Sequence, residues 1–466
     1  MPATRTAVLA ATAAWFDAGA LLADLQRRVA YRTESQDPRS AEALERYLHE
    51  EIRPSVERLG FRASIWPNPV VGAPPMLFAE RLEDPARPTV LVYGHGDVVA
   101  GYAEQWGQGR TPWNVTVVDD RWYGRGTADN KGQHTINLAA LGRILEARGR
   151  LGFNAKVLIE MGEEVGSPGL HAACERRAEA LRADVLIVSD GLRLSSGRFT
   201  IFLGARGAFN FDLHVDLREG AHHSGNWGGL LANPGTILAH AIASLVDARG
   251  RIMVDALRPT PIPESVRRAL ASIEPGEPGG PAIDGDWGEP SLTPAERVFG
   301  WNALEVLAFG TGNPERPVNA IPPRAVAHLQ VRFVVGCEWR TFIPAVRAHL
   351  DGCGFKAVKI VQGTMEPMNA TRLDPDHPWV RWASASVAAT TGDAPAILPN
   401  LGGSLPNDCF ADVLQLPTIW VPHSYPACSQ HAPDEHMLAS VAREGLQIMT
   451  GLFWDLGAPE SLPPLR

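Results

Sequence analysis

Residues 88–97, PTVLVYGHGD, decide how the fold of this chain is interpreted. An apolar run from Pro88 to Tyr93 leads directly into the polar sequence Gly94-His95-Gly96-Asp97. A short continuous apolar run of this kind is typical of a strand that is buried on both faces of a sheet. In open α/β sheets, ligands bind beyond the carboxyl ends of the strands. We therefore expect a functional site where this strand ends, at His95 and Asp97.

Three other short apolar runs have the same form. They are Ala155 to Met161, Val185 to Val188 and Pro417 to Val421. Between the first and second of the four runs, Gln133 to Arg148 has the pattern of a helix. Strands that alternate with helices predict an α/β layer.

The middle of the chain has a different pattern. Phe209 to Leu217 alternates strictly between apolar and polar residues, and Val326 to Val334 is a second alternating segment. Both predict strands with one wet face. Between them, Asn233-Pro234 starts a helix that we expect to end at Gly250. The sequence thus predicts an α/β domain, residues 1–203 and 365–466, interrupted by an inserted α+β domain, residues 204–364.

Composition narrows the class of protein. The 466 residues are 45% hydrophobic and 20% charged, which is typical of a packed globular core. The formal net charge is −9 and no Lys/Arg run occurs, which argues against nucleic acid and anionic membranes as partners. No apolar stretch has the length of a membrane helix.

Cysteine usage and the N-terminus bear on location. The five cysteines form no C-x-x-C pair and are odd in number, which favours a reducing cytoplasm over a disulfide scaffold. Ala7 to Phe16 is largely apolar, so it can be interpreted either as a first helix or as a short export signal. We favour a retained first helix, because an amphipathic pattern continues through Leu21 to Ala30.

Polar clusters also follow the other apolar runs. Glu163-Glu164 follows the second run, Ser189-Asp190-Gly191 follows the third, and a glycine-rich loop, residues 124–132, contains Asp129. With a histidine that follows the late strand, the clusters supply two imidazoles and three carboxylates, which are His95, Asp129, Glu164, Asp190 and His431. Both groups bind zinc, at about 2.0–2.2 Å. Crowded carboxylates repel one another, and two divalent cations would relieve that repulsion, with one carboxylate bridging them.

Two further acids fit such a site. Asp97, two residues after His95 on an extended segment, lies on the same side and can orient the His95 ring. Glu163 beside a metal ligand is suited to general-base catalysis. Each motif alone has a simpler explanation, such as a solvated Glu-Glu pair or a Ser-Asp-Gly turn. Their joint occurrence at strand ends favours the metal site.

The motifs match one family. Segments 91–99, 122–132, 159–169 and 223–229 resemble the aminoacylase–carboxypeptidase G–carnosinase family of dinuclear metallopeptidases. The resemblance implies a zinc-peptidase-like catalytic domain with a mixed, mostly parallel sheet flanked by helices. It also implies an inserted α+β lid through which two copies form a homodimer.

By this resemblance, His95, Asp129 and Asp190 would hold one Zn²⁺, and Asp129, Glu164 and His431 a second, with Mn²⁺ or Co²⁺ as substitutes. Glu163 would be the general base and Asp97 the orienting acid. A cis peptide is expected at Asp129–Asn130. His436 and His423 are rival ligands, and the motif position favours His431.

The resemblance also implies substrate-binding residues. His223 would reach the active site of the partner subunit and stabilise the oxyanion, although His222 lies next to it. Asn319, Arg332, Gly403 and Ser404 resemble residues that hold the substrate. The alternative interpretation of Arg332 is a solvated charge on a strand, and that of Gly402-Gly403-Ser404 is a simple turn.

The expected activity is therefore metal-dependent hydrolysis of an amide bond in a dipeptide or short peptide. One alternative is a deacylase or amidohydrolase that acts on N-acyl or N-carbamoyl amino acids. The other is a non-catalytic metal-binding protein, which the presence of both Glu163 and Asp97 disfavours.

Overall fold

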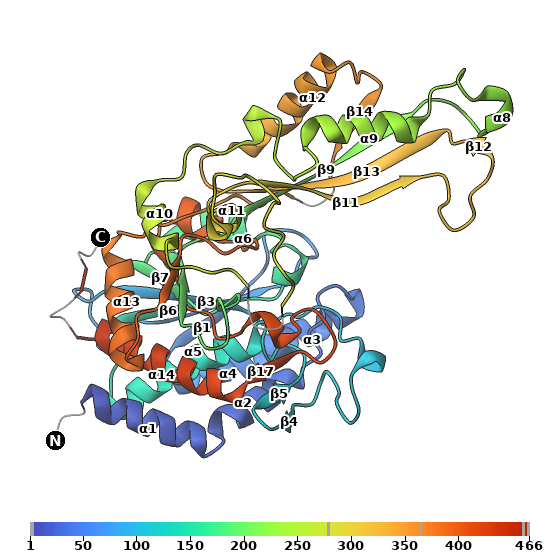
Figure 1. The fold of residues 1–466 in the computed structure, drawn as a ribbon. Coiled ribbons are helices and arrows are strands. Elements are labelled where there is room, and N and C mark those ends of the chain that lie inside the picture. The colour runs from blue at the N-terminus through green and yellow to red at the C-terminus, as the bar shows by residue number, and fades with distance from the viewer. Residues whose placement is uncertain (1–3, 277–279, 364–365, 459–461, 464–466) are drawn as a thin grey trace.

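The computed structural model describes residues 4–276, 280–363, 366–458 and 462–463. It contains an α/β body with an eight-stranded sheet and an arm with a four-stranded sheet, which extends away from the body (Figure 1). This architecture confirms the predicted fold class.

The central sheet is mixed and mostly parallel. Its strand order is β1 (Arg62–Trp66), β2 (Met76–Arg81), β6 (Asn154–Glu160), β3 (Thr89–His95), β7 (Val185–Val188), β16 (Thr418–Trp420), β8 (Thr200–Phe202) and β15 (Ala396–Leu398). Strand β3 pairs in parallel with β6 and β7, whereas β1, β2 and β6 pair antiparallel. The four apolar runs of the sequence form β3, β6, β7 and β16, as predicted.

The apolar run in β3 is continuous because both faces of the sheet are covered. Val90 and Val92 belong to one core cluster, and Leu91 and Tyr93 belong to the other. The first cluster includes residues of α1 (Arg5–Asp17), α2 (Ala20–Val29), α5 (Lys131–Arg148), α13 (Pro378–Thr391) and α14 (Ala439–Leu456). The second includes residues of α6 (Leu170–Arg176), α7 (Ala178–Leu181), α10 (Glu264–Leu270) and α11 (Pro294–Phe299).

The remaining helical and strand segments of the body lie around this layer. Helices α3 (Ala41–Arg46) and α4 (Arg53–Arg58) flank a π-helical segment, Tyr47–Ile52. Strands β4 (Thr116–Val118), β5 (Arg121–Tyr123) and β17 (His436–Leu438) form a small separate sheet.

The N-terminal helix packs into the body. Val8 and Phe16 of α1 are buried, and Phe16 stacks on Trp122 with ring centroids 5.4 Å apart. Arg5 pairs with Asp455 of α14 at 2.9 Å. Among the described helices, none alone is long and apolar enough to cross a membrane, and only the bent pair α1 and α2 passes such a test together.

The arm is an antiparallel sheet in the order β11 (Ala303–Thr311), β13 (Arg324–Phe333), β9 (Gly207–Asp216) and β14 (Val358–Gln362). Residues of β9 alternate between buried and half-exposed, as the sequence predicted. Helices α9 (Pro234–Leu245) and α12 (Phe342–Gly352) contribute their apolar residues to the same cluster as the buried face of this sheet. At the tip of the arm, β10 (His222–His223) pairs with β12 (Ala320–Ile321) beside α8 (Ser224–Trp227).

One helix boundary differs from the prediction. The side chain of Asn233 caps α9 by accepting from the backbone N–H groups of Gly235 and Thr236. The helix ends at Leu245 and not at Gly250, because Val246 is extended and forms a bridge with Ile252.

The chain passes between the two sheets twice. Residues 204–208 lead into the arm, and residues 368–373 run antiparallel to them on the way back, with Ala208 bridging Met368. The predicted boundary between residues 364 and 365 lies outside the described residues, so the division into 1–203, 204–364 and 365–466 stays a prediction.

Candidate active site

The five candidate ligands converge at one edge of the central sheet. His95 is the last residue of β3, Glu164 lies in the turn after β6, and Asp190 follows β7. Asp129 lies in the loop before α5, and His431 lies in the loop between β16 and β17. They form two groups of three, and within each group the ligand atoms lie within 4.8 Å of one another.

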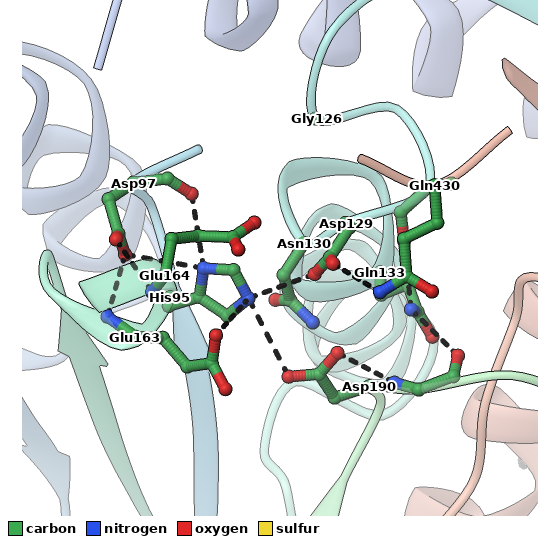
Figure 2. Close-up of polar contacts among 12 residues, drawn as sticks. His95, Asp97, Gly126, Asp129, Asn130, Gln133, Glu163, Glu164, Asp190 and Gln430 are labelled. Carbon is green, nitrogen blue, oxygen red and sulfur yellow. Dashed lines mark hydrogen bonds and ion pairs between the residues drawn. The ribbon is translucent and has the colours of Figure 1, made fainter. Parts of the chain in front are cut away.

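Asp129 belongs to both groups. In the first group, its Oδ1 lies 3.0 Å from His95 Nε2, which is also 3.7 Å from Asp190 Oδ2. In the second, His431 Nε2 lies 3.0 Å from Asp129 Oδ2 and 3.0 Å from Glu164 Oε2. Figure 2 shows the His95 ring facing Asp129 and Asp190 from the opposite side of the site. One carboxylate between two such groups is the arrangement that a pair of bridged metal ions requires.

Asp97 holds two parts of this site. His95 Nδ1 lies 3.1 Å from the main-chain oxygen of Asp97 and 3.3 Å from its Oδ1, so two acceptors lie beside this ring nitrogen. The Asp97 carboxylate also accepts the backbone N–H groups of Glu163, at 3.2 Å, and Glu164, at 3.0 Å (Figure 2). The same acid thereby fixes a histidine and the turn that carries two glutamates.

The electrostatics of the cluster fit bound cations. Burial raises the pKa of Glu164 to about 7 and that of Asp190 to about 6, and the charge of Asp129 adds to both shifts. Burial raises the pKa of Glu163 further, and the charges of Asp190 and Glu164 act in the same direction. Asp129 differs: despite its burial, hydrogen bonds with His431 and His95 hold its pKa well below the usual range.

Two buried carboxylate oxygens of this cluster have no hydrogen-bond partner within the described part of the chain. They are Oε1 of Glu164 and Oδ2 of Asp190, one from each group. Buried carboxylate oxygens are ordinarily paired or bound to a metal. The unpaired oxygens and the mixed nitrogen and oxygen donors both fit zinc or a similar divalent ion.

A cavity of about 200 Å³ opens beside the cluster. Asp129, Glu163, Asp190 and His431 line one part of it, and Gly403, Ser404 and Leu405 line another. Glu163 Oε2 lies 3.9 Å from His95 Nε2. Glu163 thus faces the cavity next to the candidate ligands, where a general base would have to act.

The structure brings only some of the predicted substrate residues to this cavity. Arg332 Nη1 donates to Ser404 Oγ at 2.7 Å, and Ser404 and Gly403 line the cavity. His223 and Asn319 lie instead at the tip of the arm, where the N–H of Ser224 donates to the Asn319 carbonyl at 2.9 Å. Both are exposed, and α8 and β12 mark their position in Figure 1.

The rival histidines lie elsewhere. His436 Nε2 lies 2.7 Å from the Tyr425 hydroxyl, and His423 Nε2 lies 3.0 Å from Ser189 Oγ. Neither belongs to a ligand group. The peptide bond Asp129–Asn130 is cis, as the family resemblance implied.

Sequence reasoning missed several residues that hold the cluster. Gln430 donates from its side-chain amide to the Asp129 carboxylate, and its position next to His431 was the one available signal. Glu435 accepts the backbone N–H groups of Gly126, Ala128 and Asp129. No local pattern marks it, because its partners are main-chain groups about 300 positions earlier.

Comparison with known proteins agrees with this geometry. The family described as Peptidase family M20/M25/M40 matches residues 91–455. A cysteinylglycine-S-conjugate dipeptidase from Corynebacterium striatum is 28% identical over 330 residues, which is 68% of this chain and 70% of that protein. A Beta-Ala-His dipeptidase from Rattus norvegicus is 34% identical over 205 residues, 43% of this chain and 42% of that protein.

Solved structures share the whole fold. Human carnosine dipeptidase 1 superposes with a TM-score of 0.77 at 24% identity, covering 98% of this chain and 100% of that chain. An M20 family metallo-carboxypeptidase from Sulfolobus solfataricus has a TM-score of 0.77 at 25% identity, covering 94% and 99%.

The body carries a cluster of histidines and carboxylates at the edge of its mixed sheet, and an arm with a second sheet is inserted into the chain of the body. These features define a metallohydrolase. The chain belongs to the peptidase family M20/M25/M40.

Proposed function

We propose that this protein hydrolyses the peptide bond of dipeptides with two divalent metal ions, Zn²⁺ in the first instance. The observation that carries the proposal is the sharing of Asp129 between two ligand groups beside a cavity that also contains Glu163. The names of the Corynebacterium and rat relatives, both dipeptidases, support the dipeptide as substrate.

Each residue has a role in this proposal. His95, Asp129 and Asp190 would hold one ion, and Asp129, Glu164 and His431 the other. When bound, such ions lower the pKa of water and polarise a carbonyl group. Glu163 takes the proton from the attacking water and passes it to the leaving amine. Asp97 keeps the His95 ring and the Glu163–Glu164 turn in place.

The proposal includes a homodimer that forms through the arm. Strand β11 is an edge strand, and its Val306, Leu307 and Phe309 are between 41% and 57% exposed. An exposed apolar edge strand is a ready surface for pairing with another chain. His223 lies at the tip of the same arm, and its Nδ1 accepts from the N–H of Gly225, which leaves Nε2 available to a substrate in the partner's cavity. In the partner, His223 would stabilise the oxyanion and Asn319 would assist substrate binding.

A cytoplasmic location is part of the proposal. All five cysteines are free thiols, and Cys174, Cys409 and Cys428 are buried. Unpaired thiols are typical of proteins in a reducing compartment.

A substrate panel tests the activity. Protein loaded with Zn²⁺, Mn²⁺ or Co²⁺ is assayed on dipeptides, on tripeptides, and on N-acetyl and N-carbamoyl amino acids. We expect dipeptides to have the highest kcat/KM. Preferential turnover of the acylated amino acids would replace the dipeptidase proposal with the deacylase alternative, and no turnover of any compound by metal-loaded protein would favour a metal-binding role.

A further inference from the structure

Two arginines lie together beside the loop 401–405, which lines one part of the cavity. Arg206, at the first passage between body and arm, is 6% exposed, and Arg332 on β13 is half-buried. Arg206 Nη2 donates to the main-chain oxygen of Arg332 at 3.1 Å. Within the described ranges, no carboxylate oxygen lies within 4.0 Å of either guanidinium. The charge of Glu305 acts on Arg206, but Glu305 forms no ion pair with that guanidinium. A buried guanidinium without a paired anion is unusual, because burial of charge costs free energy unless an anion compensates it.

Arg206 holds the loop 401–404 through its main chain. Its backbone N–H donates to the carbonyls of Leu401, at 3.2 Å, and Gly403, at 3.1 Å. Its carbonyl accepts from Ser404 Oγ at 2.7 Å. Since Arg332 Nη1 donates to the same Ser404 oxygen at 2.7 Å, the three residues form a closed ring of hydrogen bonds.

The charge of this ring is positive at neutral pH. Burial and the neighbouring Arg332 lower the pKa of Arg206 only to about 10, so the guanidinium keeps its proton. Its buried Nε has no hydrogen-bond partner among the described residues. The carboxylates Asp129, Glu163 and Asp190 also line the cavity. The cavity is therefore lined by acidic residues where metal ions would bind, and its neutral loop 401–405 is held from behind by the two arginines.

We propose that Arg206 is a positioning residue for recognition of the free carboxylate of the substrate. It fixes Arg332 and Ser404 in the geometry that binds this carboxylate, and its own charge adds to the positive field there. This inference rests on the proposed dipeptidase function and adds a residue that determines substrate choice. Arg206 acts through Arg332 and Ser404, not at the bond that is cleaved.

The variant Arg206→Met isolates the guanidinium, because the main-chain contacts of residue 206 with the loop 401–404 remain. Wild type and variant are compared on a dipeptide and on the same dipeptide with a C-terminal amide. Because hydrogen bonds that involve charged groups are stronger than neutral ones, we expect kcat/KM for the free dipeptide to fall about tenfold or more. The loss should occur in KM, whereas kcat/KM for the amide should change less than about twofold.

Arg372→Met is the matched control. Arg372 lies on the returning passage, is half-buried, and has a pKa lowered by burial, but within the described residues it forms no hydrogen bond or ion pair with the loop 401–404. For this variant, the ratio of kcat/KM for the free dipeptide to kcat/KM for the amide should equal that of the wild type. Arg206→Lys keeps a positive charge and should recover part of the preference for the free dipeptide. It also serves as the test variant if Arg206→Met does not fold, as thermal unfolding would show.

Double variants separate positioning from simple proximity. If Arg206 and Ser404 act in one ring, the losses from Arg206→Met and Ser404→Ala on the free dipeptide should combine to less than their product. Equal losses on dipeptide and amide would overturn the inference and indicate a structural role. A wild type that cleaves both substrates equally well would also overturn it, while the proposed function would stand. A wild type that cleaves neither would contradict the proposed function instead.

Discussion

The backbone N–H of Asp129 donates to the carboxylate of Glu435, 306 positions later in the chain, at 3.1 Å. The same carboxylate pairs with Arg125 at 2.7 Å, and both side chains are 1% exposed. Glu435 lies four residues after His431. One buried carboxylate thus joins the loop that carries the shared ligand Asp129 to the segment that carries His431.

The first prediction concerns this connection. Glu435→Gln leaves Arg125 buried without a charge partner, which costs about 3–5 kcal/mol in comparable cases. We expect the free energy of unfolding of the metal-free variant to fall by about that amount, measured by urea denaturation. Zinc titration should also show weaker binding, because Asp129 is no longer held relative to His431.

The control uses an exposed pair. Glu57 pairs with Arg53 at 2.8 Å within one helix, and both side chains are more than 40% exposed. Glu57→Gln should change the free energy of unfolding by less than about 1 kcal/mol. Similar effects of the two substitutions would show that Glu435 has no special part in joining the loops.

A second prediction separates catalysis from metal binding. Glu163 lines the cavity but belongs to neither ligand group, whereas its neighbour Glu164 belongs to one. Glu163→Ala should therefore keep both metal ions and lower kcat by about 10²–10⁴-fold, the usual contribution of a general base. Glu164→Ala should lose metal. Elemental analysis together with kinetics distinguishes the two variants. Near-wild-type turnover by Glu163→Ala would refute the role of Glu163 as general base.

The third prediction is a pH dependence of the metal-free protein. In the folded chain the pKa of Asp190 is about 6 and that of Glu164 about 7, both above their ordinary values of 3.8 and 4.5. A carboxyl whose pKa is raised by folding binds its proton more tightly in the folded state. Its stabilising contribution is complete below the ordinary pKa and is lost as pH rises through the folded pKa.

The contribution of these two groups should therefore lower the Tm of chelator-treated protein as the pH rises from 5 to about 8. Added Zn²⁺ should raise Tm most at the upper end of that range, because metal ligands must be deprotonated to bind. The variant Asp190→Asn should show a smaller decline without metal and a smaller response to zinc. A metal-free Tm that rises through this range would contradict the assignment.

Several elements could be predicted because their burial leaves a local pattern. Strand β3 has core on both sides and an uninterrupted apolar centre, Val90 to Tyr93, whereas β9 has one wet face and alternates. The end of α9 could not be predicted. Gly250 was a reasonable stop signal, but the pairing of Val246 with Ile252 ends the helix earlier, and such pairing depends on the fold.

The site shows the same division. His95, Glu164 and Asp190 follow apolar strands, so their convergence could be inferred from sheet geometry alone. Arg206 and Glu435 could not be found in this way. Both act on main-chain groups of distant segments, and their neighbours in sequence carry no trace of that contact.

The position of His223 leads to the last prediction. In the single chain it lies exposed at the tip of the arm, away from the cavity that contains Glu163. If it acts in the partner's site, His223→Ala should lower kcat strongly without loss of metal. A mixture of His223→Ala and Glu163→Ala protomers, unfolded and refolded together, should regain activity, since a hybrid dimer contains one site with both residues intact.

The expected yield can be calculated. Random pairing of equal amounts makes half of the dimers hybrid, and one of their two sites is intact, so about a quarter of the wild-type activity should return. Light scattering must show dimers in each sample. The control mixes His223→Ala with wild type, which should give activity in proportion to the intact sites. Dimers that form normally but regain no activity would mean that His223 does not act across the interface.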